Sequence, residues 1–568
     1  MIGLKPYCGV RSSKRQSLSE QIKSRVSSPC SSGRRGPHNI KAEMKAHDLA
    51  YDLTLAALLI ITPLAFGAVH IWAFSLAEIL SFSLLAIWAV KVMLDPGFAF
   101  DRRLLPLAVA AALFISFVLS TLIPMPRGAV SALSPSAHEL YRQAIDGYAQ
   151  INSTEYISRA LSVAPHMTLK SLLKTISYMA VFFSAAHELR DEARAKRVVL
   201  LVLAVGFLEA VYGLTLFFHS KLSILGYERT KAGGAWGTYV NKNHFAGYVG
   251  MAALLGLGHL MGQSPRPDRA RSIRQYLSGF FKSARSTVTS LYLVAIAFMV
   301  LGVSFSSSRM GIAALLSSVA LMAAMLAASR RKRTVMLLIT ALLAISILLS
   351  VFGIGHVKNR FQGVWDNALG NRLEIWESTI ELSRDYPVIG SGLGTYSSVF
   401  QLYAPEGLSS LTRQAHNDYL ELLAETGAAG VLIVYVALIY FIYLVSRNWL
   451  ACSKKHGRHM AALGALSAVF YILVFSLTDF NLQIPANAYL FFISCALAHA
   501  LLSDTPEAGL SGAAPPATRW KTRTSAIMLL CALVPLMALS ALQWRAESTF
   551  PAERSFIRAD DPLRITSP

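Results

Sequence analysis

The chain is poor in charged residues and in cysteine. Only 15% of its 568 residues are Asp, Glu, Lys or Arg, whereas a soluble domain usually has about 25%. The 5 cysteines are scattered, and none belongs to a Cys-x-x-Cys pair or to a Cys/His metal spacing. The shortage of charge excludes a soluble enzyme and a disordered chain, and the cysteine pattern predicts neither a disulfide framework nor a zinc site.

Apolar residues are abundant and occur in long runs. They make up 54% of the sequence, and the runs lack the alternation that a membrane β-barrel requires. A bilayer core about 30 Å thick is crossed by about 20 apolar helical residues. We therefore predict an all-α polytopic membrane protein with about 13 transmembrane helices. The expected spans are residues 52–69, 71–93, 104–124, 169–187, 198–219, 244–262, 287–304, 310–328, 334–354, 429–446, 460–477, 486–502 and 524–543.

The charge balance is strongly basic, with 53 Lys and Arg against 32 Asp and Glu and a net charge of +21. In a soluble protein this excess would suggest a nucleic-acid partner, but in a membrane protein it is typical of the positive-inside rule, so we expect no nucleic acid. If the N-terminus is cytoplasmic, the most basic loops all fall on the cytoplasmic side. These loops are 102–103, 266–285, 330–333, 454–458 and 519–523.

The same patterns divide the chain into regions. Residues 1–46 are rich in Ser, Lys and Arg and are expected to be a disordered basic cytoplasmic tail; a transit peptide, or a start at Met44, remains an alternative. The other expected regions are a membrane domain at 47–505, a cytoplasmic linker at 506–523 and an extra C-terminal transmembrane helix with an outer tail at 524–568. Two long segments, 125–168 and 355–428, fall outside, so function is expected on the outer face.

The second outer segment begins with an expected helix. Asn371 is a good N-cap, and Glu374 stands where a capping-box acid belongs. The helix must end near Tyr386, because Pro387 follows it. We therefore predict a helix that starts at Asn371 and carries polar residues in its first turn.

Arg372 and Trp376 are four residues apart on this helix and therefore neighbours on its surface. Arg372 is either an ordinary surface arginine lying on the tryptophan or a first-turn arginine that presents its guanidinium to a phosphate. A glycine turn follows at Gly390, Gly392 and Gly394. It is either a flexible turn or a loop whose N–H groups approach an anion, and Gly392 is a candidate substrate contact.

Residues 413–427 predict a second helix, with Gly427 as its C-cap. The helix runs into the next span, which places His416 in a crevice at the outer leaflet. A single helical histidine is more often structural, but the polar neighbours of His416 favour a binding site. These neighbours are Arg413, Asn417 and Tyr419.

Further polar residues lie at the outer ends of other spans. Asn241, Asn243 and His244 precede the sixth span, as interface anchors or as hydrogen-bonding partners of a sugar or phosphate. Arg309, before the eighth span, either snorkels to lipid head groups or reaches a buried diphosphate.

Four carboxylate and amide residues complete the set of candidates. Asp479 and Asn487 flank the outer turn between the eleventh and twelfth spans. Glu78 and Glu209 lie inside spans, where a carboxylate is either functional or protonated and hydrogen-bonded.

Four motifs in combination resemble a known family. The sequences VNKNHFAGY at 240–248, SSSRMG at 306–311, NRLEIWESTIELSRDYPVIGSGLGTY at 371–396 and AHNDYLELLAETGAAG at 415–430 resemble the O-antigen ligase and polymerase superfamily of bacterial inner membranes. The resemblance covers roughly residues 200–500. It implies a helical membrane fold of the lipid-dependent glycosyltransferase (GT-C-like) kind, with a large periplasmic loop that holds a key histidine.

The resemblance also implies a reaction. Members of the superfamily transfer a glycan from an undecaprenyl-diphosphate carrier to lipid A core, to another glycan repeat or, in some branches, to protein. The transfer is thought to be inverting and independent of metal, so no cofactor is expected. His416 matches the essential histidine of the family, and Arg309 and Arg372 match the arginines thought to hold the diphosphate. Asn243 and His244 match a recurrent box.

The extra span after residues 515–516 and the long basic N-terminus depart from the family pattern. The shared motifs leave open whether the activity is that of a ligase or of a polymerase. Two other classes also stay open, a lipid-linked glycan flippase or transporter and a non-catalytic scaffold of a polysaccharide assembly complex. The expected partners are the lipid-linked donor, the acceptor, membrane lipids and polysaccharide assembly proteins.

Overall fold

The computed structural model of the chain describes residues 37–95, 98–152, 158–219, 228–229, 234–263, 286–328, 365–405, 412–451, 456–503, 516–549 and 563–564. The chain divides into two units, residues 1–46 and 47–568. All the functional residues predicted from the sequence lie in the second unit.

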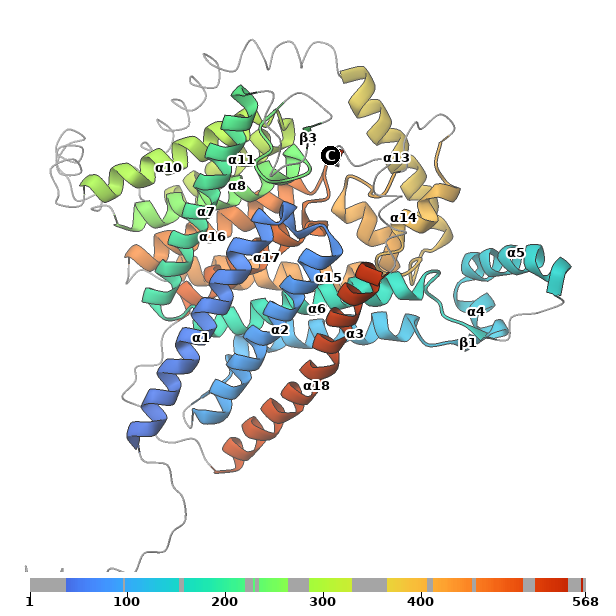
Figure 1. The fold of residues 1–568 in the computed structure, drawn as a ribbon, viewed down its shortest axis with the longest axis horizontal. Coiled ribbons are helices and arrows are strands. Elements are labelled where there is room, and N and C mark those ends of the chain that lie inside the picture. The colour runs from blue at the N-terminus through green and yellow to red at the C-terminus, as the bar shows by residue number, and fades with distance from the viewer. Residues whose placement is uncertain are drawn as a thin grey trace, which may run out of the picture. The chain divides into compact units, whose positions relative to one another are not determined.

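Long helices dominate the described residues (Figure 1). The long helices are α1 (Pro37–Leu64), α2 (Ile71–Leu94), α3 (Leu105–Thr121), α6 (Pro165–Glu188), α7 (Glu192–Phe218), α8 (Lys242–Gln263), α10 (Ser286–Phe305), α11 (Arg309–Ala328), α15 (Asp418–Ala451), α16 (His456–Phe475), α17 (Pro485–Leu502) and α18 (Pro516–Thr549).

Shorter elements fill the two outer segments. These elements are β1 (Met125–Pro126), α4 (Arg127–Leu133), α5 (Pro135–Asn152), β2 (Ser158–Arg159), α13 (Trp365–Asp385) and α14 (Tyr396–Val399). The pairs β1–β2 and β3–β4 (Glu228–Arg229 and Leu563–Arg564) are short antiparallel ladders. Short 3-10 turns complete the set at η1 (Phe66–Ala68), η2 (Arg102–Leu104), η4 (Phe400–Leu402) and η5 (Asn481–Gln483).

The prediction of an all-α polytopic membrane protein is confirmed. Within the described ranges, 11 helices are long and apolar enough to cross a membrane. The fourth expected span forms α6, but this helix carries Lys170 and Lys174 and is not among the 11. The ninth expected span, 334–354, lies outside the described residues.

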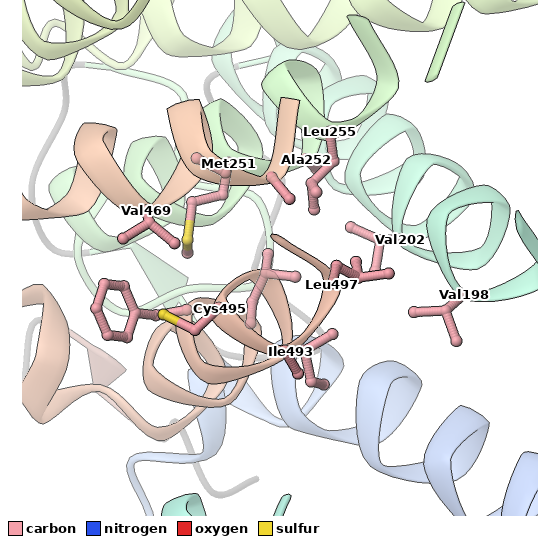
Figure 2. Packing of buried hydrophobic residues seen from close by; sticks show 14 of the residues in the cluster. Val198, Val202, Met251, Ala252, Leu255, Val469, Ile493, Cys495 and Leu497 are labelled. Atoms are coloured by element: carbon pink, nitrogen blue, oxygen red, sulfur yellow. The ribbon is translucent and has the colours of Figure 1, made fainter. Parts of the chain in front are cut away.

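The core of the bundle joins helices that are far apart in the sequence. Figure 2 shows side chains of α7, α8, α16 and α17 pointing toward one another, with Val202, Met251 and Leu497 among them. Glycines let two of these helices approach closely, because a Cβ on Gly258 of α8 would lie 2.5 Å from the Cα of Gly464 of α16. Close packing of small residues therefore stabilises this helix pair, whereas the hydrophobic effect stabilises the bundles of water-soluble proteins.

The helices of the bundle end at two different polar clusters. We call the first the His416 end; it gathers the C-terminal ends of α1, α10 and α16 and the N-terminal ends of α6, α8, α11, α15 and α17. We call the second the ion-pair end; it gathers the stretch of α1 around Asp48 and Asp52, the N-terminal part of α7 and the C-terminal ends of α2, α6 and α17. Most of the predicted site residues belong to the His416 end.

Candidate active site

His416 lies just before α15 and not on a helix, so the prediction of a helical histidine is wrong. Its backbone is left-handed, with φ of 52°, a conformation that costs a non-glycine residue about 1–2 kcal/mol. The helix begins at Asp418 because Asn417 caps it, with Oδ1 accepting from the N–H groups of Tyr419 at 3.0 Å and Leu420 at 3.1 Å. In a longer helix these two N–H groups would donate to backbone carbonyls one turn earlier, so the cap fixes the start of the helix at Asp418.

Buried carboxylates hold the backbone on both sides of His416. Glu421 Oε2 accepts from the N–H of Ala415 at 2.8 Å. Asp418 Oδ2 accepts from Ser476 Oγ at 2.5 Å and from the N–H of Leu482 at 3.2 Å. The loop that carries the histidine is therefore tied to α15 itself and to the turn after α16, and this network maintains the left-handed backbone.

Asp479 joins the two predicted histidines. Its Oδ1 lies 3.7 Å from His244 Nε2 and 3.7 Å from His416 Nδ1, and the carboxylate is almost fully buried. Both distances are longer than a hydrogen bond. The ring of Phe480 contacts both imidazoles edge to face, at 4.5 Å from His244 and 4.9 Å from His416. The sequence placed Asp479 at this turn but gave it no role, since no motif links it to either histidine.

The Asp479 carboxyl lies in the turn between α16 and α17, outside the membrane spans. Burial acts to raise its pKa, but the imidazoles of His244 and His416 lower it, and the net result is a pKa below the ordinary value. Its Oδ1 also accepts from the N–H of Phe480 at 2.9 Å. The site therefore holds a buried anion between two imidazoles at neutral pH.

The segment that carries His244 is anchored by amides. Asn487 Nδ2 donates to the carbonyl of His244 and to Oδ1 of Asn481, at 2.9 Å in each case. A Cβ on Gly247 would lie 2.2 Å from Asn481 Oδ1, so only glycine fits at this position. Asn241 Oδ1 accepts from the N–H of Asn243 at 2.8 Å at the start of α8. These contacts fix the start of α8 against the turn that contains Asp479.

Helix α13 covers the His416 loop, but it starts earlier than the sequence predicted. It begins at Trp365, so Asn371 is not its N-cap and Arg372 is not in its first turn. The predicted end near Tyr386 is confirmed, since the helix stops at Asp385. Trp376 Nε1 donates to the carbonyl of Ala415 at 3.0 Å, which brings the face that Arg372 shares with Trp376 toward the residue before His416.

Arg309 is the first residue of α11 and lies at the same end of the bundle. The turn before it is tight, because Ser307 has φ of 57° and Ser306 Oγ accepts from the N–H of Ser308 at 3.1 Å. A Cβ on Gly311 would contact Phe475 and Ala246, 3.2 and 3.3 Å away. The start of α11 is thus packed against α8, which carries His244, and against the end of α16, which leads into the turn that carries Asp479.

The glycine turn packs tightly. A Cβ on Gly390, Gly392 or Gly394 would lie within 2.4 Å of a neighbouring atom, and all three glycines have positive φ. The N–H of Gly392 donates to the carbonyl of Glu425 at 2.9 Å, and the N–H of Tyr396 donates to the Glu425 carboxylate at 3.0 Å. The N–H groups in and just after this turn therefore bond to Glu425 of the chain itself.

Tyr419 and Arg413, two other predicted substrate contacts, lie in different surroundings. Tyr419 OH donates to the carbonyl of Leu473 at 2.5 Å, a contact that packs α15 against α16. The side chain of Arg413 is exposed. Gly427, predicted as a C-cap, has φ of 60° and interrupts α15, so this prediction is confirmed.

The two carboxylates inside spans differ in their surroundings. Glu209 Oε2 accepts from the N–H of Thr238 at 2.9 Å, while Thr238 Oγ1 lies 2.7 Å from Glu209 Oε1 and 2.8 Å from the carbonyl of Pro63. The single hydroxyl proton of Thr238 satisfies only one acceptor, so both contacts are made when Glu209 is protonated. Glu78 is fully buried, and neither of its oxygens has a hydrogen-bond partner among the described residues.

Comparison with known proteins agrees with the motifs. The family model described as O-antigen ligase matches residues 294–435. This stretch contains Arg309, Arg372 and His416, whereas His244 and Asp479 lie outside it. No curated protein matches the chain. Within the described residues, no group of three His, Cys, Asp or Glu side chains is arranged to hold a metal ion.

The matched family implies a ligase or polymerase role of the glycosyltransferase kind in polysaccharide biosynthesis. The apolar helices show a multi-pass membrane protein. His416 and helix α13, which carries Arg372, lie within the matched stretch. Asp479 lies outside it in the sequence, but its carboxylate lies beside His416 in the fold. The chain is therefore a multi-pass membrane protein that matches the O-antigen ligase family model over residues 294–435.

Proposed function

We propose that the protein transfers a glycan from an undecaprenyl-diphosphate carrier to an acceptor hydroxyl at the outer face of the bacterial inner membrane. The observation that carries the proposal is the Asp479 carboxylate between His416 and His244 at one end of the bundle. An anion that orients an imidazole is the usual arrangement for a general base.

The charge distribution supports the orientation. The ion-pair end carries basic residues in and next to its loops, among them Arg102, Arg103, Arg190 and Arg197. By the positive-inside rule this end faces the cytoplasm, so the His416 end lies on the opposite side of the membrane. We also propose a cytoplasmic N-terminus, as the sequence predicts. The candidate site then faces the periplasm. In this proposal the fold of the membrane domain is of the lipid-dependent glycosyltransferase kind.

His416 acts as the base in this proposal. Because Nδ1 faces Asp479, the proton of the neutral imidazole belongs on Nδ1, and the lone pair of Nε2 is left for substrate. The acceptor hydroxyl gives its proton to Nε2 as its oxygen attacks the anomeric carbon. The bond from that carbon to the diphosphate breaks, its electron pair leaves with the phosphate oxygen, and the configuration inverts. Base assistance of this kind is worth about 10²–10⁴-fold.

Arg309 and Arg372 hold the leaving diphosphate in this proposal. Their planar guanidinium groups bind phosphate oxygens through paired N–H bonds. They neutralise the charge that develops on the leaving group, which is the task that a metal ion performs in many other enzymes. Trp376, Asn241, Asn243, His244 and the exposed Arg413 are the candidates for contacts with the sugars.

The test is transfer by the purified full chain, supplied with a lipid-diphosphate glycan and an acceptor in the presence of EDTA. We expect full transfer by the wild-type protein. Arg372→Lys should transfer less, because lysine keeps the charge but lacks the planar fork of arginine. Wild-type donor affinity in Arg372→Lys would contradict the clamp. A deletion strain separates the two branches, since loss of a polymerase leaves single repeats and loss of a ligase leaves long lipid-linked chains.

A further inference from the structure

A polar cavity lies at the ion-pair end, away from the candidate active site. It has a volume of about 400 Å³ and lies among the ends of α7, α8, α10, α16 and α17. This volume is within the range of small-molecule sites. Its polar lining consists of Glu192, Lys196, His259, Gln263 and Arg458.

Arg458 gives the cavity a fixed positive charge. The side chain is 8% exposed, and it donates from Nε to the carbonyl of Leu501 at 3.2 Å and from Nη2 to the carbonyls of Ala500 at 3.0 Å and Ser503 at 3.1 Å. These bonds satisfy the last carbonyls of α17. They leave Nη1 without a hydrogen-bond partner among the described residues, so a buried guanidinium has donors to spare beside the cavity.

The other polar groups add one more cation. Lys196 is exposed at the rim, and no acid of the described residues lies within ion-pair distance of its ammonium. Gln263 Nε2 is bonded to His259 Nε2 at 2.6 Å and to Tyr292 OH at 3.3 Å, so this pair is held in place. Glu192, one turn before Lys196 on α7, is the acid of the lining, and the balance of formal charge is positive.

The rest of the lining is apolar and leads to the membrane-facing surface. The wall is completed by Ala195, Val199, Gly262, Val288, Gly457, Ala461 and Leu501. Val288 is 48% exposed, and Leu291 on the next turn of α10 is 65% exposed. The segment that connects α8 to α10 also carries six Lys and Arg against one Asp in its sequence, residues 264–285. A positive head-group pocket that opens beside exposed apolar residues suits an amphipathic anion.

We propose that this cavity binds the head group of an anionic phospholipid, with the acyl chains lying along α10. The phosphate lies between Nη1 of Arg458 and the ammonium of Lys196, and the glycerol hydroxyls reach the His259–Gln263 pair. Basic pockets between transmembrane helices recognise anionic lipids in this way. The site is independent of the proposed transfer reaction, since it lies at the other end of the bundle.

The experiment titrates the purified full chain in neutral detergent with phosphatidylglycerol, phosphatidylcholine or inorganic phosphate and counts bound molecules by native mass spectrometry. We expect tighter binding of phosphatidylglycerol than of phosphatidylcholine. Lys196→Gln should weaken it about fivefold, since one cation near the surface is worth about 1 kcal/mol. Val288→Trp should weaken it by filling the cavity without a change of charge.

Each variant has a matched control on the same helix. Arg197→Gln removes the same charge from the next residue of α7, whose partner is Asp52, and Leu291→Trp adds the same bulk outside the cavity. Both should bind as the wild type does. Equal binding by all four variants would overturn the proposal. Binding of inorganic phosphate that displaces the lipid completely would also overturn it, because the site would then be one for a free anion.

Discussion

The two ends of the bundle use charge in opposite ways. At the ion-pair end, Arg194 contacts Asp48 at 2.8 Å, Asp52 at 2.5 Å and Glu188, and Lys91 contacts Asp48 at 2.7 Å and Glu188 at 2.8 Å. These pairs join α1, α2, α6 and α7. The charges of this network are therefore matched with opposite charges at hydrogen-bonding distance.

At the His416 end the buried polar groups are only partly satisfied. His244 Nε2 and His416 Nδ1 are buried and face Asp479 at 3.7 Å, and neither nitrogen has a hydrogen bond among the described residues. The backbone is also strained at His416 and Ser307, with φ of 52° and 57°. Strained backbone together with unsatisfied polar atoms in one loop is typical of a site where a substrate completes the bonding. The comparison therefore assigns stability to one end and chemistry to the other.

The largest effect is expected at the imidazole of the His416 end. His416→Ala should lower glycan transfer by about 10²–10⁴-fold, because the base is lost, while the protein still inserts and folds. Transfer is measured in membranes with a lipid-diphosphate donor. Full transfer by this variant would contradict the assignment of His416 as the base.

A comparable loss at the ion-pair end should appear in stability and not in chemistry. Arg194→Ala leaves three carboxylates without their shared partner and should lower the free energy of unfolding by about 3–5 kcal/mol. Arg197→Ala is the matched control; its side chain is 56% exposed, so a loss of about 1 kcal/mol or less is expected. Thermal denaturation in detergent measures both, and equal Tm values would break the comparison.

Asp479→Asn tests the link between the two histidines. Transfer should fall on the order of 10²-fold, less than in His416→Ala, because the base remains but its tautomer is no longer fixed. The pH profile of transfer should change as well, which a purely structural defect would not produce. Asp385→Asn, at the end of α13 and outside the site, should leave the profile unaltered.

The lowered pKa of Asp479 sets the sign of a pH effect on stability. A carboxyl whose folded pKa lies below its unfolded value contributes stability above the unfolded value, near pH 4, and loses it as pH falls toward the folded pKa. The Tm of the wild type should therefore fall below pH 4 more steeply than that of Asp479→Asn. Parallel curves for the two proteins would contradict an ionised, stabilising Asp479.

The smallest effect is expected at Glu209. Glu209→Gln keeps an acceptor for the N–H of Thr238 and a donor for its hydroxyl. Transfer should therefore match that of the wild type, and the free energy of unfolding should stay within about 0.5 kcal/mol of it. Glu209→Ala removes both contacts and should lower the Tm. A large loss in Glu209→Gln would show that the ionised carboxylate is needed, and the intramembrane residue would then belong with the functional groups.

The sequence predicted the membrane helices and several of the local devices correctly. Runs of apolar residues predicted spans because a bilayer requires them, and Gly427 predicted the break in α15 because only glycine adopts its backbone readily. The predicted start of α13 was wrong. The N-cap signal at Asn371 is worth only about 1 kcal/mol, and the helix begins six residues earlier, at Trp365. The helical placement of His416 failed because periodicity does not reveal the cap at Asn417.

The sequence by itself determined the class of protein, its family motifs and the candidate histidine and arginines, because these depend on composition and on neighbours along the chain. Only the tertiary structure decided that Asp479 lies between His244 and His416, that the glycine turn encloses Glu425 and that Arg194 collects three carboxylates. The first of these joins α8, the His416 loop and the turn after α16, and the last joins α1, α6 and α7. No local pattern encodes such a meeting, because the packing of distant helices creates it.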